Sequence, residues 1–384
     1  MFCKLYTVNC IHFAILVYRK VRQLSTETGF PSLDHLASRV REEQLLAPLW
    51  PEGRGIALID QTKLPFAQEI LQITTAVEMA AAIREMKVRG SGAIGCAGAM
   101  GAYLAVRNAP GQPESWNERV QLLREARPTA VALRRAVDEV LDAARAAAEP
   151  VAAAATAAAG FVERQLEMER AIGRHGAAAI PDGATVLTHC HSGALAGAGY
   201  GGRALSVIRG AVESGKQIQV IAQETRPYFQ GARITAWELF QLGIPVTLIT
   251  DGMSGAMMET GRVDVCVVGS DRLAINGDLA NKVGTYLVAL AAREHDVPFY
   301  TATTRYNVDA GCRSGKDIPI EFRSAGEVLT IHDRPITVEG VPALYPAFDI
   351  TPAGLLTGIV TEGGLFNKPF EEKLRWLLAP EAEG

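Results

Sequence analysis

Short apolar runs alternate with stretches of helical spacing along the second half of the chain. The runs are rich in β-branched residues and read "TVLTHC", "VIAQE", "VTLITD", "VCVVGSD" and "PFYTATT". Strands this apolar, separated by helices, are typical of a parallel sheet covered on both faces. The pattern therefore predicts an α/β fold whose parallel-sheet domain spans 166–384.

The first half of the chain has a mixed pattern. A strand-like run at 55–65 is followed by helical spacing over 74–88 and again over 126–149. The alanine-rich segment 143–160 predicts a helix with a small-residue face, because alanine is the best helix former. We expect a smaller domain of helices and strands over 51–165, joined by this helix to the second domain.

Residues 1–50 are expected to form a poorly ordered N-terminal extension. The apolar run at 11–18 is too short for a membrane span, which needs ~20 residues. The run is followed by basic and serine residues, and no acidic residue precedes Glu27, a composition typical of an organelle transit peptide. The simpler interpretation is an unstructured extension, so we expect a cytoplasmic protein, with organelle targeting as the alternative.

Composition narrows the classes of function. Hydrophobic residues make up 48% of the 384 positions, as in a globular protein, and the net charge is −4. Proteins that bind nucleic acid or membrane surfaces usually carry a basic face, so we expect neither partner. The six cysteines are scattered without a C-x-x-C pair, which argues against a disulfide framework or a zinc ribbon.

Chemically active side chains gather where the predicted strands end. Ligands of parallel sheets bind beyond the carboxyl ends of the strands. The residues at these ends are Cys190, Glu224, Thr225, Arg226, Asp251, Asp271, Thr304 and Arg305. They provide one thiol, three carboxylates and two guanidinium groups, so we expect the site there.

Three segments carry this chemistry. In "LTHCHSGALAGAGYG" a helix start after Cys190 favours a reactive sulfur, although a free cysteine is also a common core residue. His189 and His191 flank it, but no third ligand suggests a metal site. "ETRPYFQGARITAWEL" offers arginines for phosphate recognition.

The third segment, "VGSDRLAINGDLANKVGTY", has an unusual density of polar groups. They are Asp271, Arg272, Asn276, Asp278, Asn281 and Lys282. Helix capping explains one or two of them, but six indicate a binding site. Directly after an apolar strand, Asp271 is expected to be partly desolvated and suited to proton transfer.

The stretch "RGSGAIG" at 89–95 matches the G-x-G-x-x-G pattern of a dinucleotide-binding loop. Such a fingerprint should follow a strand within a β-α-β unit, whereas this one follows the helical spacing of 74–88. We therefore rank a dinucleotide oxidoreductase last among the functions considered. A glycine-rich turn beside Arg89 can instead hold an anion through its backbone N–H groups.

Together these segments resemble the methylthioribose-1-phosphate isomerase family, relatives of the regulatory α, β and δ subunits of the exchange factor for eukaryotic translation initiation factor 2. The resemblance runs from about Gly55 to Glu362 and is carried by "LIDQTKLP", "VRGSGAIG", "ARPTAV", "LTHCHSGALA", "ETRPYFQGARITAWEL", "VGSDRLAINGDLANKVGTY", "IPIE" and "PAFDITP". It implies a homodimeric aldose–ketose isomerase without metal or organic cofactor, with a Rossmann-like C-terminal domain.

The resemblance also implies roles for individual residues. Cys190 matches the family's catalytic cysteine and Asp271 its catalytic aspartate. The positions that match substrate contacts are Arg89, Gly90, Ser91, Arg127, Gln230, Asn281 and Lys282. The chain departs from the family pattern at Ser91, Gly92, Ala132, His191, Gly252 and the run "TTRYNVD", in loops expected to face the substrate.

These departures leave the exact sugar open. The implied reaction converts 5-methylthioribose 1-phosphate to 5-methylthioribulose 1-phosphate, by either a proton or a hydride route. An isomerase of ribose 1,5-bisphosphate or 5-deoxyribose 1-phosphate is the first alternative, with Arg305 as the candidate for a second phosphate. The second is a non-catalytic, sugar-phosphate-sensing subunit, which has no need of both Cys190 and Asp271.

Overall fold

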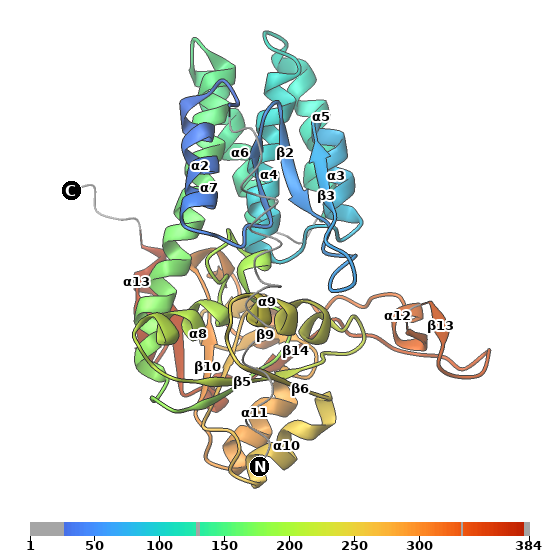
Figure 1. Cartoon of the computed structure of the whole chain (residues 1–384), viewed down its shortest axis with the longest axis vertical. Helices are drawn as coiled ribbons and strands as arrows, with labels where there is room; N and C mark the ends of the chain where they lie inside the picture. The colour runs from blue at the N-terminus through green and yellow to red at the C-terminus, as the bar shows by residue number, and fades with distance from the viewer. Residues whose placement is uncertain (1–26, 128–130, 332, 380–384) are drawn as a thin grey trace. The chain divides into compact units, whose positions relative to one another are not determined.

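The computed structural model describes residues 27–127, 131–331 and 333–379, and the chain divides into two compact units (Figure 1). The first unit runs to Arg170 and includes Ser192–Ser206 and Trp237–Gly243. The second comprises Ala171–His191, Val207–Ala236 and the chain from Ile244 onward. The transit-peptide interpretation concerns residues 1–26, which lie outside the described residues, and the domain boundaries expected from the sequence stay predictions.

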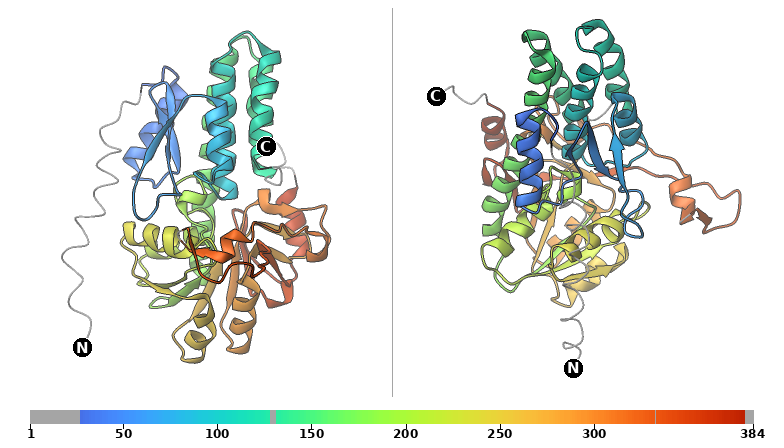
Figure 2. Two further views of the ribbon diagram at one scale, coloured as in Figure 1. Left: turned by 90° about the vertical axis from the view of Figure 1, so that its right-hand side faces the viewer. Right: turned by 45° about the horizontal axis from the view of Figure 1, so that its top comes forward.

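Helices dominate the first unit, and a small antiparallel sheet of three strands lies beside them (Figure 2). In chain order its elements are α2 (Pro31–Glu42), β1 (Leu49–Glu52), β2 (Gly55–Ile59), β3 (Ile70–Ile73), α3 (Ala76–Arg84), α4 (Ser91–Arg107), α5 (Pro113–Ala126), α6 (Val131–Ala146) and α7 (Pro150–Gly176). The C-terminal end of α7 belongs to the second unit. None of the helices in the described part of the chain has the length and apolar character to cross a membrane.

Residues 31–42, which the sequence placed in a poorly ordered extension, instead form helix α2. The buried side chains of α2 are those of Leu33, Leu36, Ala37 and Val40, whose spacing puts them on one face of the helix. Arg39 adds a hydrogen-bonded ion pair of 2.8 Å with Glu167 of α7. The segment is ordered because it buries this face within the first unit.

The glycine-rich stretch after Arg89 begins helix α4, and the element before it is helix α3 rather than a strand. This confirms the helical context that argued against a dinucleotide-binding loop. One of the repeated glycines, Gly98, is required for packing, because a Cβ atom there would lie 2.6 Å from the Leu133 side chain of α6. Glycine therefore lets α4 and α6 approach each other closely.

The alanine-rich segment is helical, as predicted, but it is shared between two helices. Helix α6 ends at Ala146, and α7 begins at Pro150, a residue that favours the first turn of a helix. The buried alanines of α7 include Ala154, Ala155, Ala158 and Ala159. They form the small-residue face expected from the sequence.

The second unit is built around a seven-stranded sheet with the order β16-β15-β10-β7-β4-β5-β6. Every neighbouring pair is parallel except β15 and β16. The elements of this region are β4 (Thr185–Thr188), α8 (Ala204–Glu213), β5 (Gln219–Gln223), β6 (Val246–Ile249), α10 (Ser254–Glu259), β7 (Val265–Val268), α11 (Thr285–Glu294), β10 (Phe299–Ala302), β15 (Gly358–Thr361), β16 (Gly364–Asn367) and α13 (Glu371–Leu378). Helix α9 (Ala236–Gln241) belongs to the first unit apart from Ala236, and so do the residues of α8 up to Ser206. The predicted parallel sheet is confirmed.

A second, four-stranded sheet with the order β11-β8-β9-β14 belongs to the same unit. Its strands are β8 (Arg272–Ala274), β9 (Leu279–Lys282), β11 (Val308–Asp309) and β14 (Phe348–Thr351). Leu187 and Cys266 of the large sheet share one apolar core with Leu273 of β8 and Val288 of α11. This core fixes the β8–β9 hairpin against the ends of the parallel strands.

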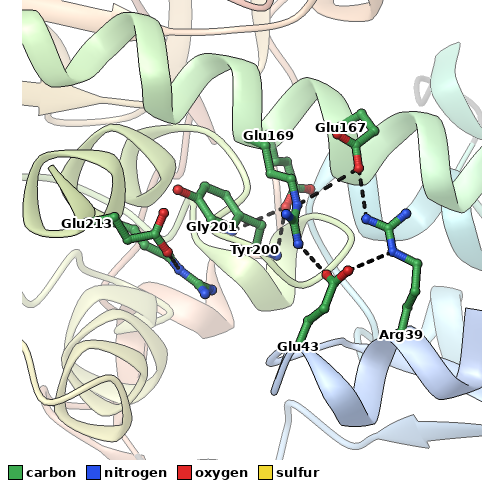
Figure 3. A network of polar contacts seen from close by, with 9 residues as sticks. Arg39, Glu43, Glu167, Glu169, Tyr200, Gly201 and Glu213 are labelled. Carbon is green, nitrogen blue, oxygen red and sulfur yellow. Dashed lines mark hydrogen bonds and ion pairs between the residues drawn. The ribbon is translucent and has the colours of Figure 1, made fainter.

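A buried carboxylate organises the loop at 198–202 in the first unit (Figure 3). Glu169 of α7 is fully buried and accepts hydrogen bonds of 2.5–3.2 Å from the backbone N–H groups of Ala198, Tyr200, Gly201 and Gly202. Burial raises the pKa of Glu169, while the nearby charge of Arg203 and the N–H donors oppose that rise. In the same figure Glu43, which is partly exposed, pairs with Arg39 and Arg170.

These two glutamates should differ strongly in their contribution to stability. Glu169→Ala leaves four buried N–H groups without their acceptor, so we expect a loss of about 3 kcal/mol or more in the free energy of unfolding. Glu43→Ala removes partly exposed ion pairs, which are typically worth ~0.2–1 kcal/mol each. Urea unfolding of both variants measures the difference, and similar losses would contradict the role assigned to Glu169.

Candidate active site

The order of strands in the large sheet defines where a ligand should bind. From β4 the chain moves outward through β5 to β6, then returns to β7 on the other side of β4 and continues to β10. In open α/β sheets the crevice lies at this reversal, outside the carboxyl ends of the strands. Cys190 follows the end of β4 by two residues, and Asp271 follows the end of β7 by three. The two predicted catalytic residues therefore flank the reversal point.

Cys190 is held in an uncommon backbone conformation. Its φ of 67° lies in the left-handed region, which costs a non-glycine residue ~1–3 kcal/mol. Two threonine hydroxyls fix the residue: Thr225 Oγ1 accepts a bond of 2.9 Å from the Cys190 N–H, and Thr235 Oγ1 donates one of 2.8 Å to its carbonyl. Both backbone groups are thereby satisfied, and the sulfur is oriented by its surroundings rather than by a flexible loop.

Gln230 forms a hydrogen bond with the Cys190 sulfur. Its side-chain amide donates to Cys190 Sγ across 3.3 Å, and only 3% of the residue is exposed. The other end of the amide, Oε1, is buried and accepts no hydrogen bond from any described residue, so it can accept one from a ligand hydroxyl. The turn that follows, η3 (Gly231–Thr235), is π-helical, a geometry frequent at functional sites.

Glycine is required at position 231 for a steric reason. A Cβ atom there would lie only 1.7 Å from the Gln223 carbonyl oxygen at the end of β5. The bare backbone lets the π-helical turn pack directly on this strand, which brings the preceding Gln230 to the sulfur.

Asp251, one of the predicted strand-end residues, holds the loop that carries Thr225. Its two carboxylate oxygens accept the backbone N–H groups of Thr225 and Arg226 at 2.8 and 2.7 Å. Burial raises the pKa of the neighbouring Glu224, and the charge of Asp251 raises it further. The Arg226 side chain donates to the Val328 carbonyl at 2.7 Å, so part of its hydrogen-bonding capacity supports the fold.

Asp271 is fixed through its backbone. Its N–H donates to the Ala280 carbonyl at 3.0 Å, and its own carbonyl accepts a bond of 3.0 Å from the Asn307 side chain. The residue is exposed, which corrects the expectation of a partly desolvated carboxylate: the strand ends at Val268, and the intervening turn carries Asp271 to the surface.

Half of the dense polar cluster at 271–282 proves to be structural. Asp278 accepts the N–H groups of Gly315 and Ala353 at 2.9 and 2.8 Å, and Asn276 bonds to Asp278 within the β8–β9 turn. Burial opposes ionisation of Asp278, but these donors prevail and lower its pKa.

Arg272 of the same cluster forms an ion pair of 3.2 Å with Asp309. Three of the six polar groups that indicated a binding site thus have structural partners. As site residues, Asp271, Asn281 and Lys282 stay predictions.

Asn281 and Lys282 close strand β9 and are both buried. Asn281 donates to Thr285 Oγ1 at 3.0 Å. The Lys282 ammonium donates to the Tyr345 hydroxyl at 3.2 Å and lies 4.7 Å from the centre of the Phe348 ring. Aromatic faces stabilise a cation that has lost its hydration, so the Tyr345 and Phe348 rings stabilise this buried ammonium group.

The two histidines beside Cys190 serve as hydrogen-bonding partners within the protein. His189 Nε2 lies 3.0 Å from the Val283 carbonyl, and His191 Nδ1 lies 3.1 Å from Thr235 Oγ1. Burial lowers the pKa of His189, although Asp251 and its hydrogen-bonding neighbours favour the charged form. His189 therefore ties the end of β4 to the end of β9, with Cys190 and Lys282 directly beside the joined residues.

The remaining predicted substrate contacts belong to the first unit. Arg89, Gly90 and Ser91 are consecutive at the start of α4, where Gly90 has a φ of 92°. Arg127 follows α5 and donates to Met86 Sδ at 3.0 Å. As contacts of the substrate, these four residues stay predictions.

Sequence reasoning missed Thr235 and Tyr345. Thr235 lies within the quoted "ETRPYFQGARITAWEL" segment, but a threonine at the start of an apolar helix gives no sign that it bonds to a cysteine 45 residues earlier in the chain. Tyr345 directly precedes the "PAFDITP" motif, which was the available signal. Both contacts join segments that are distant in sequence.

Comparison with known proteins places this arrangement in a family. The profile of the initiation factor 2 subunit family matches residues 87–368. The chain belongs to this family. A methylthioribose-1-phosphate isomerase of Anaeromyxobacter sp. (strain K) is 49% identical over 328 residues, covering 85% of this chain and 95% of the relative. One of Pelotomaculum thermopropionicum is 45% identical over 337 residues, covering 85% and 92%.

Two solved structures are also similar over most of their length. The 5-methylthioribose 1-phosphate isomerase of Pyrococcus horikoshii OT3 matches with a TM-score of 0.82 and 35% identity, covering 87% of this chain and 96% of that one. The translation initiation factor eIF-2B, subunit delta, from A. fulgidus matches with a TM-score of 0.81 and 39% identity, covering 87% and 99%. The mixed α/β fold with its parallel sheet is thus shared with both.

No group of three or more His, Cys, Asp or Glu side chains in the described part of the chain is arranged to hold a metal ion. The expectation that the reaction needs neither metal nor organic cofactor stays a prediction.

Asp349 of β14 gives the second unit a pH-dependent stability. Its carboxylate accepts hydrogen bonds from the backbone N–H groups of Gly284, at 2.7 Å, and Tyr286. Burial raises the pKa of Asp349 from 3.8 to about 6, although these two bonds and the charge of Lys282 oppose the rise. The folded protein therefore binds this proton more tightly than the unfolded chain. Its contribution to the free energy of unfolding should fall by up to about 3 kcal/mol as the pH rises from about 4 to about 6.

Asp349→Asn removes this titration. The free energy of unfolding of the wild type minus that of the variant should decrease across this window and level off above it, because the lost acceptor adds only a constant offset. Equilibrium urea unfolding at several pH values measures the difference. A difference independent of pH would contradict the assignment.

Proposed function

We propose that this chain is an aldose–ketose isomerase that converts 5-methylthioribose 1-phosphate to 5-methylthioribulose 1-phosphate. The observation that carries the proposal is the position of Cys190 and Asp271 on the two sides of the strand reversal. Curated relatives that are 45% and 49% identical bear the name of this isomerase, which supports the choice of reaction and sugar. A binding protein would need a cradle for the sugar, but no thiol and carboxylate at such positions.

The reaction rearranges the substrate without any outside oxidant or reductant. The bond between C1 and the ring oxygen breaks, and the ring oxygen gains a proton. The hydrogen on C2 moves to C1, the C2 hydroxyl loses its proton, and a carbonyl forms at C2. The phosphate stays on C1 throughout, so atoms and electrons balance within the sugar and one relayed proton.

Two side chains divide this work. Asp271 gives a proton to the ring oxygen and takes one from the C2 hydroxyl, acting as acid and base in turn. Cys190 assists the transfer of hydrogen from C2 to C1, either as the base of a proton route or by polarising a hydride shift. Gln230 supports the role of Cys190 in either route, because its amide donates a hydrogen bond to the sulfur while its buried Oε1 can accept one from a sugar hydroxyl.

The phosphate requires a separate set of groups. We assign it to Arg89, to the backbone N–H groups at Gly90 and Ser91, and to Arg127. A helix start favours an anion through its unsatisfied N–H groups and its dipole, and Gly90 lies at the start of α4. Asn281 and Lys282 would hold hydroxyl oxygens of the sugar.

The wider description of the protein is part of the same proposal. We describe the region 166–384 as a Rossmann-like catalytic domain and 51–165 as a smaller mixed domain. A homodimer in the cytoplasm is the expected working form.

Substitution of either catalytic candidate should abolish most turnover while leaving the fold intact. A positioned acid or base contributes ~10²–10⁴ in rate, so we expect Cys190→Ser and Asp271→Asn each to lower kcat by at least ~10²-fold. Cys312→Ser and Asp333→Asn are controls for the two kinds of substitution, because neither residue belongs to the predicted site; Cys312 is buried among Ala274, Ala280 and Ile318. Steady-state kinetics tests this; near-normal turnover would remove the residue concerned from the mechanism.

The choice of sugar is tested by offering three substrates separately. We expect ketose formation from 5-methylthioribose 1-phosphate and much less from ribose 1,5-bisphosphate, because Arg305 already bonds to Glu362 at 3.1 Å. 5-Deoxyribose 1-phosphate is the third substrate. Preference for either alternative would overturn the assigned sugar, and activity on none would favour a non-catalytic, sugar-phosphate-sensing subunit.

A further inference from the structure

Tyr345 occupies a fixed position beside the end of β9. The segment after it is anchored by the Val283 N–H, which donates to the Ala347 carbonyl at 3.2 Å, and the Arg323 N–H donates to the carbonyl of Tyr345 itself at 2.9 Å. Only 3% of the tyrosine is exposed. The ring is therefore part of the wall of the second unit rather than a mobile surface side chain.

The Tyr345 hydroxyl accepts a hydrogen bond from the protein but donates none to any described residue. Its oxygen accepts the hydrogen bond from Lys282 Nζ at 3.2 Å. No described residue accepts the proton of this hydroxyl. A buried O–H without an acceptor is costly, so the position favours a ligand oxygen as the missing partner.

The same hydroxyl lies in the neighbourhood of Cys190. His189 Nε2 and the Val283 carbonyl, 3.0 Å apart, join the residue before Cys190 to the residue after Lys282. Burial raises the pKa of the Tyr345 phenol to about 12, and negative charge on Cys190 contributes to the rise although Arg323 opposes it. The phenol accordingly keeps its proton at neutral pH and can donate it in a hydrogen bond to a ligand.

We propose that the Tyr345 hydroxyl, held by Lys282, donates a hydrogen bond to the C2 oxygen of the sugar beside Cys190. The C2 oxygen gains negative charge when its proton leaves, in the proton route and in the hydride route alike. A donor polarised by an ammonium group strengthens as that charge develops, so it stabilises the transition state more than the bound substrate. The inference rests on the proposed isomerase function and adds a residue to it.

Tyr345→Phe tests the proposal because it removes one oxygen atom and retains the ring. Loss of one such donor typically costs ~10²-fold in kcat, and we expect this loss with a KM within about threefold of wild type. Tyr300→Phe is the matched control, since this partly buried tyrosine lies on β10 and has no role in the proposed chemistry. The thermal midpoint of each variant reports whether the fold is retained.

Two kinetic results would overturn the proposal. An unchanged kcat would show that the hydroxyl does not contact the reacting sugar. A higher KM with unchanged kcat would show that Tyr345 only orients Lys282 for binding. An inactive wild type on all three sugar phosphates would instead reject the proposed function itself, so the two failures are distinguishable.

Incorporation of 3,5-difluorotyrosine at position 345 keeps the proposal testable even if the phenylalanine variant unfolds. This residue retains the ring and the hydroxyl but has a more acidic phenol. We expect activity near the wild-type level at low pH and a new loss of kcat as the fluorinated phenol ionises. A pH profile of kcat identical to that of wild type would contradict the donor role.

Discussion

The parallel pairing of β4 with β7 is the constraint on which the candidate active site depends. These strands are separated by two strands and three α-helices in the chain, yet Val186 and Leu187 lie opposite Val265 and Cys266 in the sheet. Their carboxyl ends must then meet at one edge, and their helical connections diverge there. Cys190 and Asp271 acquire their common place from this pairing, and the core around Leu273 fixes the β8–β9 hairpin beside it.

Carboxylates that accept backbone N–H groups are a recurring means of shaping the loops of both units. Loops near a site cannot use the hydrogen-bond ladder of a helix or sheet, so their N–H groups need other acceptors. The residues that provide them are Glu169, Glu238, Asp251, Asp278 and Asp349. Several acidic residues that resemble catalytic candidates in sequence thus serve to hold loops, whereas Asp271 is itself held through its backbone and is exposed.

The parts of the site that could be predicted are those with a local signature. Apolar runs of β-branched residues identify the strands, and the residue that follows each strand is then known to lie at the sheet edge. Arg305 and Asp278 show the limit of this reasoning, because each lies near a strand end but is engaged by Glu362 or by the N–H groups of Gly315 and Ala353. Helix α2 shows the converse: its stability comes from an apolar face that has a partner only in the folded unit.

The sequence by itself determined the alternation of strands and helices, the family resemblance and the identity of the strand-end residues, because hydrophobic period and short motifs are local properties. Only the tertiary structure decided which polar groups remain for chemistry. The bonds of Thr225 and Thr235 to Cys190, of His189 to Val283 and of Lys282 to Tyr345 all cross between distant segments. Such contacts depend on strand order and on the close approach of loops, and neither leaves a periodic signal in the chain.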